Sequence, residues 1–338
     1  MPVCRPTAGH VVLPAKPASH FDPALVQKKQ RNQGLCNQTG MCRLVKISRG
    51  RIIGLMLLLC VSLGALSEQT SDLPSRQATE AKTYYGFDLN NYPGDDVIVS
   101  LRKEFAYAGF WLNTPPGATA NQWAGKRTIL EKAGFGFLVL FNGRLDAELR
   151  KSADAAKVGK ADAAAALEAG RREGFPAGTV IFLDIEEGGR MLPEQKAYIY
   201  AWADGVNAGG FRAGVYCSGI AAPEGHGVTV ITANDLREHA EGRAIAYWVA
   251  NDGCPPAPGC KLTKEILAPG ESGIGFAEVW QFAQSPRRPE MTTHCKATYA
   301  TDRNCYAPGA SGLGKVALDL NTSTEADPSH GRTRPTDQ

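Results

Sequence analysis

The chain has 338 residues, of which 43% are hydrophobic and 21% are charged, so it is long enough to bury the core of one large or two medium domains. Its formal net charge of +3 arises from 37 basic and 34 acidic residues. Because no dense stripe of Lys and Arg accompanies this mild charge, the composition argues against a nucleic-acid partner.

A basic and then apolar segment near the N-terminus is typical of a secretory signal peptide. Three basic residues precede an apolar run from Ile52 to Leu66, and Ala65-Leu66-Ser67 places small residues where a signal peptidase cleaves. The run is shorter than the roughly 20 residues of a spanning helix, so a membrane anchor that stays uncleaved is the less favoured alternative. The sequence therefore predicts a signal peptide at 41–67, a linker at 68–82 and a secreted or envelope-associated protein.

Two further stretches are predicted to lie outside the folded domain. Residues 1–40 are polar, rich in proline and aperiodic, although a signal peptide normally starts at the N-terminus. We interpret them as a non-native or disordered extension, with Met41 as the true start. Residues 324–338 are polar again and are predicted to form a disordered tail.

From residue 83 onward, apolar strand-like runs alternate with helical patterns. The predicted helices have periodic apolar residues or clear start and stop signals, and they cover Asp95–Phe105, Trp123–Lys132, Ala153–Glu173, Pro193–Ala208 and Asn234–Glu241. The predicted strands cover Tyr84–Leu89, Ala106–Leu112, Gly136–Asn142, Thr179–Glu186, Arg212–Ser218, Ala244–Ala250, Ala277–Phe282 and Val316–Leu320.

The number of strands predicts the architecture. Eight strands, mostly separated by helices, over about 240 residues indicate an α/β fold of the (β/α)8 barrel type spanning residues 83–323. The helical patterns after the sixth and seventh strands are weak, which predicts a distorted or partly open barrel. A doubly wound sheet is the alternative, but it normally has a Gly-rich loop after its first strand, and Phe87-Asp88-Leu89-Asn90 has none.

Five cysteines follow the predicted signal peptide. Export permits disulfides, and the spacing suggests two local loops, Cys254 with Cys260 and Cys295 with Cys305. Cys217 is then left free and buried in a strand. Because the sequence has no Cys-x-x-Cys pair here and no histidine at a strand end, a zinc hydrolase is disfavoured, and we predict no metal and no cofactor.

The fourth strand is apolar until it ends in Asp184 and Glu186. Alternation along a strand points the two side chains the same way, with Cα atoms roughly 6.5 to 7 Å apart. Crowding by a like charge raises a carboxyl pKa, so we predict that Glu186 is the protonated acid and that Asp184 stays ionised to orient an N-acetyl group or stabilise a cation. The alternative is that both residues only solvate a strand end.

In a barrel of this type, the C-terminal strand ends share one site. They add two predicted catalytic carboxyls, Asp88 from the first strand and Asp319 from the eighth. The predicted substrate-binding residues are Tyr216, Trp248, Asn251, Trp280, Gln281 and Asn321. Carboxylates beside aromatic side chains suit sugars, whose rings have apolar faces and hydroxyl rims.

Six motifs carry a family resemblance. In strand order they are Gly86-Phe87-Asp88, Asp184-Ile185-Glu186, Gly214-Val215-Tyr216, Tyr247-Trp248-Val249-Ala250, Val279-Trp280-Gln281-Phe282 and Leu318-Asp319-Leu320-Asn321. Together they resemble family 25 glycoside hydrolases, the lysozyme-type muramidases, and more closely the secreted glycoside hydrolase-like domain of actinobacteria, a domain of unknown function. The resemblance implies Glu186 as acid, Asp184 as its partner, and Asp88 and Asp319 as supporting carboxylates.

The resemblance predicts an exported glycoside hydrolase that acts on a cell-envelope glycan such as peptidoglycan. The second and third strand ends, Gly109–Leu112 and Val139–Asn142, depart from the lysozyme pattern, so muramidase specificity does not carry over. The alternative is a non-catalytic glycan-binding or envelope-organising protein on the same barrel.

Overall fold

The computed structural model describes residues 82–308 and 315–333. The predicted extension, the signal peptide and all but the last residue of the predicted linker lie outside these ranges. None of the helices in the described ranges is long and apolar enough to cross a membrane.

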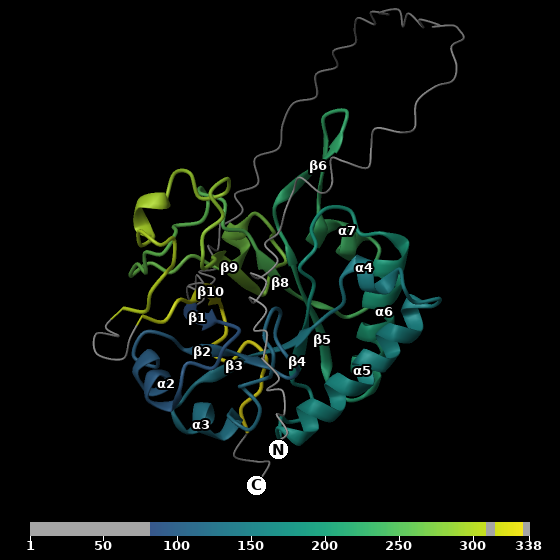
Figure 1. Ribbon diagram of the computed structural model, residues 1–338, viewed down its shortest axis with the longest axis horizontal. Coiled ribbons are helices and arrows are strands. Elements are labelled where there is room, and N and C mark those ends of the chain that lie inside the picture. The colour runs from purple at the N-terminus through teal and green to yellow at the C-terminus, as the bar shows by residue number, and fades with distance from the viewer. Residues whose placement is uncertain (1–81, 309–314, 334–338) are drawn as a thin grey trace, which may run out of the picture. The chain divides into compact units, whose positions relative to one another are not determined.

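Eight strands form a closed barrel (Figure 1). In order around the barrel they are β1 (Tyr84–Asp88), β10 (Asp319–Ser323), β9 (Val279–Ala283), β8 (Ala246–Ala250), β5 (Arg212–Ser218), β4 (Val180–Asp184), β3 (Gly136–Asn142) and β2 (Tyr107–Trp111). The predicted α/β barrel is therefore confirmed. Of the two expected irregularities, distortion and partial opening, the closed barrel shows the first and not the second.

The last strand distorts the barrel. β10 runs antiparallel to both of its neighbours and pairs Asp88 with Asp319 and Gly86 with Asn321. The prediction placed a parallel strand at Val316–Leu320, because apolar alternation does not encode strand direction. Since β10 is antiparallel, its first residue, Asp319, lies at the same barrel end as Asp88, and Asn321 lies one layer deeper.

Helices surround the barrel where the sequence has strong helical periodicity. They are α2 (Asp95–Leu101), α3 (Arg127–Lys132), α4 (Asp146–Leu149), α5 (Ala155–Arg172), α6 (Pro193–Ala208) and α7 (Thr232–Glu238). In α5, Gly159 lets α6 approach closely, since a Cβ at this position would lie 2.3 Å from the carbonyl oxygen of Tyr198. The described parts of the β8–β9 and β9–β10 loops contain only short 3-10 helices, η2 (Pro269–Ser272) and η3 (Lys296–Thr298).

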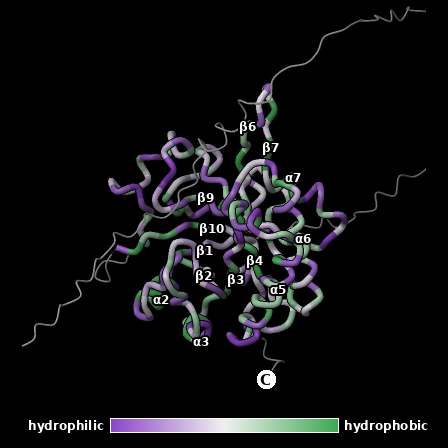
Figure 2. The backbone as a smooth tube through the Cα atoms, turned by 45° about the vertical axis from the view of Figure 1, so that its right-hand side comes forward, coloured by the Kyte–Doolittle hydropathy of each residue, from purple (hydrophilic) through white to green (hydrophobic). Residues whose placement is uncertain are grey.

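A hairpin that the sequence analysis missed follows β5. It consists of β6 (Ala221–Gly225) and β7 (Val228–Ile231), and it projects away from the barrel (Figure 2). Its turn, Gly225-His226-Gly227, has positive φ angles at all three residues. Two glycines favour this left-handed backbone, and they were the available sequence signal.

Two disulfides join the β8–β9 loop to the β9–β10 loop. Cys254 bonds Cys295 and Cys260 bonds Cys305, so the predicted pairing of sequence neighbours is wrong. The bonds span 41 and 45 residues, because the barrel brings two successive loops together at one end. Cys217 is free and buried, as predicted.

Tryptic mapping without reduction tests this pairing. No Lys or Arg lies between Cys254 and Cys260, so both fall in one tryptic peptide that bonds two different partners. We expect a single three-peptide species, which separates on reduction. Pairing of sequence neighbours would instead leave that peptide with an internal bond and no partner.

Residues 324–333 pack against the barrel, so the predicted disordered tail is wrong for this segment. Ser329 bridges β3 and β4: its N–H donates to the Phe137 oxygen at 2.9 Å, and its oxygen accepts from the Val180 N–H at 2.8 Å. Its Oγ accepts from the Val139 N–H at 2.8 Å. The polar composition was misleading because these groups bond to strand backbone rather than to solvent.

Replacing Ser329 with Ala should lower the free energy of unfolding by about 1 to 3 kcal/mol, because the buried Val139 N–H loses its acceptor. Urea unfolding measures this loss. Thr324→Ala changes an exposed residue of the same segment and serves as the control. Equal stability of Ser329→Ala and wild type would contradict the bridging role.

Candidate active site

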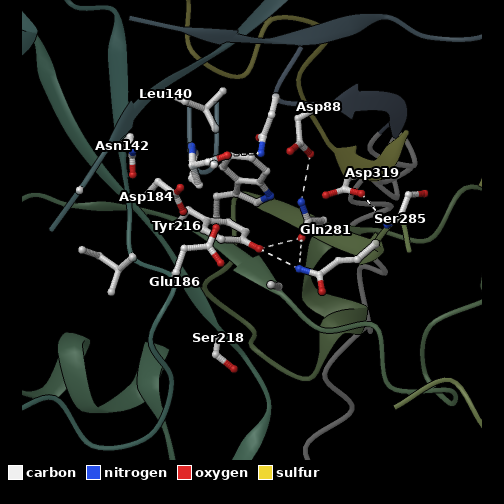
Figure 3. Close-up of a pocket in the computed structure, with 18 of the residues that line it drawn as sticks. Asp88, Leu140, Asn142, Asp184, Glu186, Tyr216, Ser218, Gln281, Ser285 and Asp319 are labelled. Carbon is white, nitrogen blue, oxygen red and sulfur yellow. Dashed lines mark hydrogen bonds between the residues drawn. The ribbon is translucent and has the colours of Figure 1, made fainter. Parts of the chain in front are cut away.

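A cavity of about 790 Å³ opens at the barrel end where the parallel strands finish. Its lining includes the last residue of several strands, among them Asp88, Asp184 and Ser218 (Figure 3). β10 contributes its first residue, Asp319. The four predicted catalytic carboxyls, Asp88, Asp184, Glu186 and Asp319, thus lie in one cavity.

Asp88 is 5% exposed, and two amides hold its carboxylate. Nδ2 of Asn321 and Nε2 of Gln281 donate to its Oδ1 at 2.7 and 3.0 Å. Gly109 on β2 provides the space, since a Cβ at this position would lie 2.6 Å from that of Asp88. Burial outweighs the two hydrogen bonds and raises the pKa of Asp88 to about 6.

Asp184 and Glu186 form a carboxyl pair of unequal exposure. Asp184 ends β4 and is 3% exposed, whereas Glu186 lies beyond the strand and is exposed within the cavity. The two carboxyl groups lie within hydrogen-bond reach of each other. Among the described residues, no N–H or hydroxyl reaches either oxygen of Asp184. Because burying a carboxylate without a donor is costly, we expect the two carboxyls to hold one proton between them.

Burial raises the pKa of both carboxyls in this pair. The pKa of Asp184 lies well above its ordinary value, and the negative charges of Glu186 and Asp88 raise it further. Desolvation of its carboxyl inside the cavity raises the pKa of Glu186, although the side chain is partly exposed, while the hydrogen bond with Asp184 and the charge of Arg288 lower it. This geometry argues against an ionised Asp184 beside a protonated Glu186, since the more buried carboxyl retains the proton more strongly.

Tyr216 and two glutamines form a hydrogen-bonded chain beside the pair. The Tyr216 hydroxyl donates to Oε1 of Gln281 at 2.7 Å and accepts from Nε2 of Gln284 at 3.1 Å (Figure 3). Gln284 also donates to Oε1 of Gln281 at 2.9 Å. With its oxygen occupied in this way, Gln281 directs its Nε2 toward Asp88, so the predicted contact residues Tyr216 and Gln281 both lie in the site.

Asp319 accepts a hydrogen bond from the backbone N–H of Ser285 at 2.6 Å. Burial, followed by the charge of Asp88, raises the pKa of Asp319 well above its ordinary value. Asp319 and Asp88 are paired in register on neighbouring strands. The first and last strands of the barrel thus provide two adjacent carboxyls with raised pKa values.

Neither tryptophan predicted to contact a sugar presents an exposed ring. Trp248 lines the cavity but is only 1% exposed, and Trp280 is fully buried and does not line it. Trp280 points to the opposite face of β9 from Gln281, as neighbouring strand residues do. Trp111 at the end of β2, which the sequence analysis did not select, also lines the cavity but is only 3% exposed.

Two predicted contact residues are structural. Asn251 donates to the Ser272 oxygen at 2.7 Å and accepts from the Gly253 N–H at 3.1 Å, which organises the loop after β8. Asn321 is fully buried beneath the cavity and accepts from Nε1 of Trp248 at 2.9 Å while it donates to Asp88. Neither side chain lines the cavity.

Sequence analysis missed the basic residues of the cavity. Four arginines line it: Arg144, Arg287, Arg288 and Arg303. They lie on loops, where no period or strand end marks them. Within the described ranges, no group of three or more His, Cys, Asp or Glu side chains has an arrangement that could hold a metal ion.

Residues 124–253 match the family model of the Rv2525c-like, glycoside hydrolase-like domain. This match confirms the resemblance seen in the motifs. The Rv2525c-like range includes the Asp184–Glu186 pair, Tyr216 and Trp248, whereas Asp88 and Asp319 lie outside it. No curated protein matches the chain significantly.

The solved structures similar to this chain have TM-scores below 0.5. An uncharacterised protein of B. stearothermophilus is 17% identical, with 70% of this chain and 94% of that chain covered and a TM-score of 0.45. The Tat-secreted protein Rv2525c of Mycobacterium tuberculosis, in complex with HEPES, is 14% identical, with 71% and 94% covered and a TM-score of 0.41. The autolysin LytC of Streptococcus pneumoniae, in complex with a synthetic peptidoglycan ligand, is 11% identical, with 71% and 46% covered and a TM-score of 0.39.

Proposed function

We propose that this chain is an exported glycoside hydrolase that acts on a cell-envelope glycan such as peptidoglycan. The observation that carries the proposal is the carboxyl pair of Asp184 and Glu186, which lies in a cavity large enough for sugar rings and whose two pKa values are raised. The match to a glycoside hydrolase-like family supports it. The two disulfides are consistent with export.

Cleavage of a glycosidic bond needs a proton for the leaving oxygen and negative charge near the anomeric carbon. Glu186 faces the cavity, so it can deliver the shared proton to a bound glycan. Asp184 is too buried to contact substrate. Its role is to share the proton with Glu186 until Glu186 delivers it. In this proposal Glu186 delivers the proton, which is the role expected from the sequence, and Asp184 shares that proton instead of acting as the fixed anion expected from the sequence.

Asp88 supplies the complementary charge. With a pKa of about 6, it is mostly ionised at neutral pH, and a developing oxocarbenium ion is stabilised by a nearby carboxylate. The amides of Asn321 and Gln281 fix its orientation. Asp319 adds a second carboxyl beside it.

The test is the release of new reducing ends. The purified full-length chain is incubated with peptidoglycan and with a panel of other envelope glycans, and the products are separated and weighed. We expect defined fragments from at least one polymer. Glycan binding without hydrolysis is the second candidate, favoured by the nearly complete burial of Asp184 and Trp248, and retention of an intact glycan with no new reducing end would support it.

A further inference from the structure

Three of the cavity arginines lie on the β9–β10 loop. Arg287, Arg288 and Arg303 line the same cavity as the carboxyls, and we refer to them as the arginine wall. The Arg287 N–H donates to the Arg303 oxygen at 2.7 Å, which joins the two ends of the loop. The Cys254–Cys295 and Cys260–Cys305 disulfides fasten the same loop to its neighbour. The hydrogen bond and the two disulfides thus fix the loop that carries the arginine wall.

Arg288 sets the position of the arginine wall relative to the acid. Its guanidinium binds both oxygens of Asp252, whose side chain is 1% exposed. It also lies close enough to Glu186 for its positive charge to lower the pKa of that carboxyl. The wall therefore borders the place where a scissile bond would meet Glu186.

Arg287 and Arg303 have no carboxylate partner among the described residues. The Arg287 guanidinium donates to Oγ1 of Thr292 at 3.4 Å, and Arg303 is exposed. Glu290 on the same loop acts on Arg288 instead. Two guanidinium groups that line the cavity, neither neutralised by an acidic side chain, leave positive charge that a ligand's negative charge can neutralise.

We propose that the arginine wall binds an anionic substituent, a carboxylate or a phosphate, on the sugar next to the scissile bond. Guanidinium forks match the geometry of these two groups, whereas an uncharged sugar needs no unpaired cation. The carboxyls deeper in the cavity repel an anion, so the charged substituent faces the wall while the uncharged ring covers the carboxyls. This inference rests on the proposed function and narrows its substrate to an acidic glycan.

Equilibrium binding tests the proposal in a Glu186→Gln background, where turnover cannot consume the probe. The probes are a peptide-free tetrasaccharide of alternating N-acetylglucosamine and N-acetylmuramic acid, chitotetraose bearing a 6-phosphate, and neutral chitotetraose. We expect the carboxylate or the phosphate probe to bind at least about ten-fold more tightly than neutral chitotetraose, since charge-assisted hydrogen bonds are the strong ones. The two charged arms distinguish the source of the anion.

Arg287→Ala and Arg303→Ala should each weaken binding of the preferred anionic probe about ten-fold and leave neutral chitotetraose unchanged. Unchanged neutral binding also shows that the variant is folded. Arg212→Ala is the matched control, because Arg212 is exposed at the first residue of β5, at the opposite end of the barrel. The proposal is overturned if neither anion binds more tightly than chitotetraose, or if the wall variants weaken all three probes equally.

The outcomes separate this inference from the proposed hydrolysis. An anion preference that depends on Arg287 and Arg303, in a chain that cleaves no glycan, supports the wall and refutes the hydrolase. Cleavage of a neutral glycan at the same rate in wild type and both wall variants refutes the wall and leaves the hydrolase standing.

Discussion

Replacing Glu186 with Gln should lower glycan turnover by about 10² to 10⁴ fold, the usual contribution of a general acid. Glutamine keeps the size and hydrogen-bonding capacity of the side chain but cannot deliver the proton shared with Asp184. Binding of intact glycan should change little, because neither the cavity wall nor the arginines are altered. Initial rates of reducing-end release and the dissociation constant measure the two effects separately.

Two further variants refine this result. Glu148→Gln removes a rim carboxylate of the same cavity and should leave the rate near that of wild type. Asp184→Asn should also lower the rate, because an amide can donate a hydrogen bond to Glu186 but cannot supply the proton that the two carboxyls share. Wild-type turnover by Glu186→Gln would remove Glu186 from the mechanism.

The stability of the protein should fall as the pH rises from about 4 to above 6. Asp88 has a pKa of about 6 in the folded protein against an ordinary value of 3.8, so the folded state binds its proton more tightly than the unfolded state does. Below pH 3.8 both states are protonated, and through this window the unfolded state ionises first. The difference of about two pKa units corresponds to about 3 kcal/mol lost from the free energy of unfolding.

Asp88→Asn isolates this effect. Asparagine can still accept from Asn321 and Gln281 but cannot ionise, so the variant should lose less stability between pH 4 and 7 than wild type, by about 3 kcal/mol. Asp96→Asn, at an exposed position on α2, should follow the wild-type curve. Denaturant unfolding at several pH values measures the difference. Identical pH dependence in Asp88→Asn and wild type would show that the Asp88 carboxyl is not destabilised by burial.

The sequence correctly predicted those helices and strands that are defined by neighbouring residues in the chain. The strands Gly136–Asn142 and Arg212–Ser218 and the helix Pro193–Ala208 have the predicted bounds, since apolar runs and Pro and Gly boundaries define each of them. The Asp184–Glu186 pair was predicted from strand alternation, although β4 ends at Asp184. The two side chains nevertheless lie together, because Glu186 lines the same cavity as Asp184.

Features that depend on long-range packing could not be predicted. The direction of β10 depends on how the chain returns to β1, and the disulfide partners depend on two loops meeting. The burial of Trp248 depends on the side chains beneath the cavity, where its Nε1 donates a hydrogen bond to Asn321. The arginine wall lies on a loop. Its residues come together only when the two disulfides and the Arg287–Arg303 hydrogen bond have formed.

The most direct test of the central claim is mass analysis of products formed in water enriched with oxygen-18. A glycoside hydrolase that uses Glu186 as its acid should release fragments with one heavy oxygen at each new reducing end, and Glu186→Gln should release almost none. If wild type and Glu186→Gln both hold the same glycan and neither releases a labelled fragment, the chain is a glycan-binding protein, and the carboxyl pair has no catalytic role.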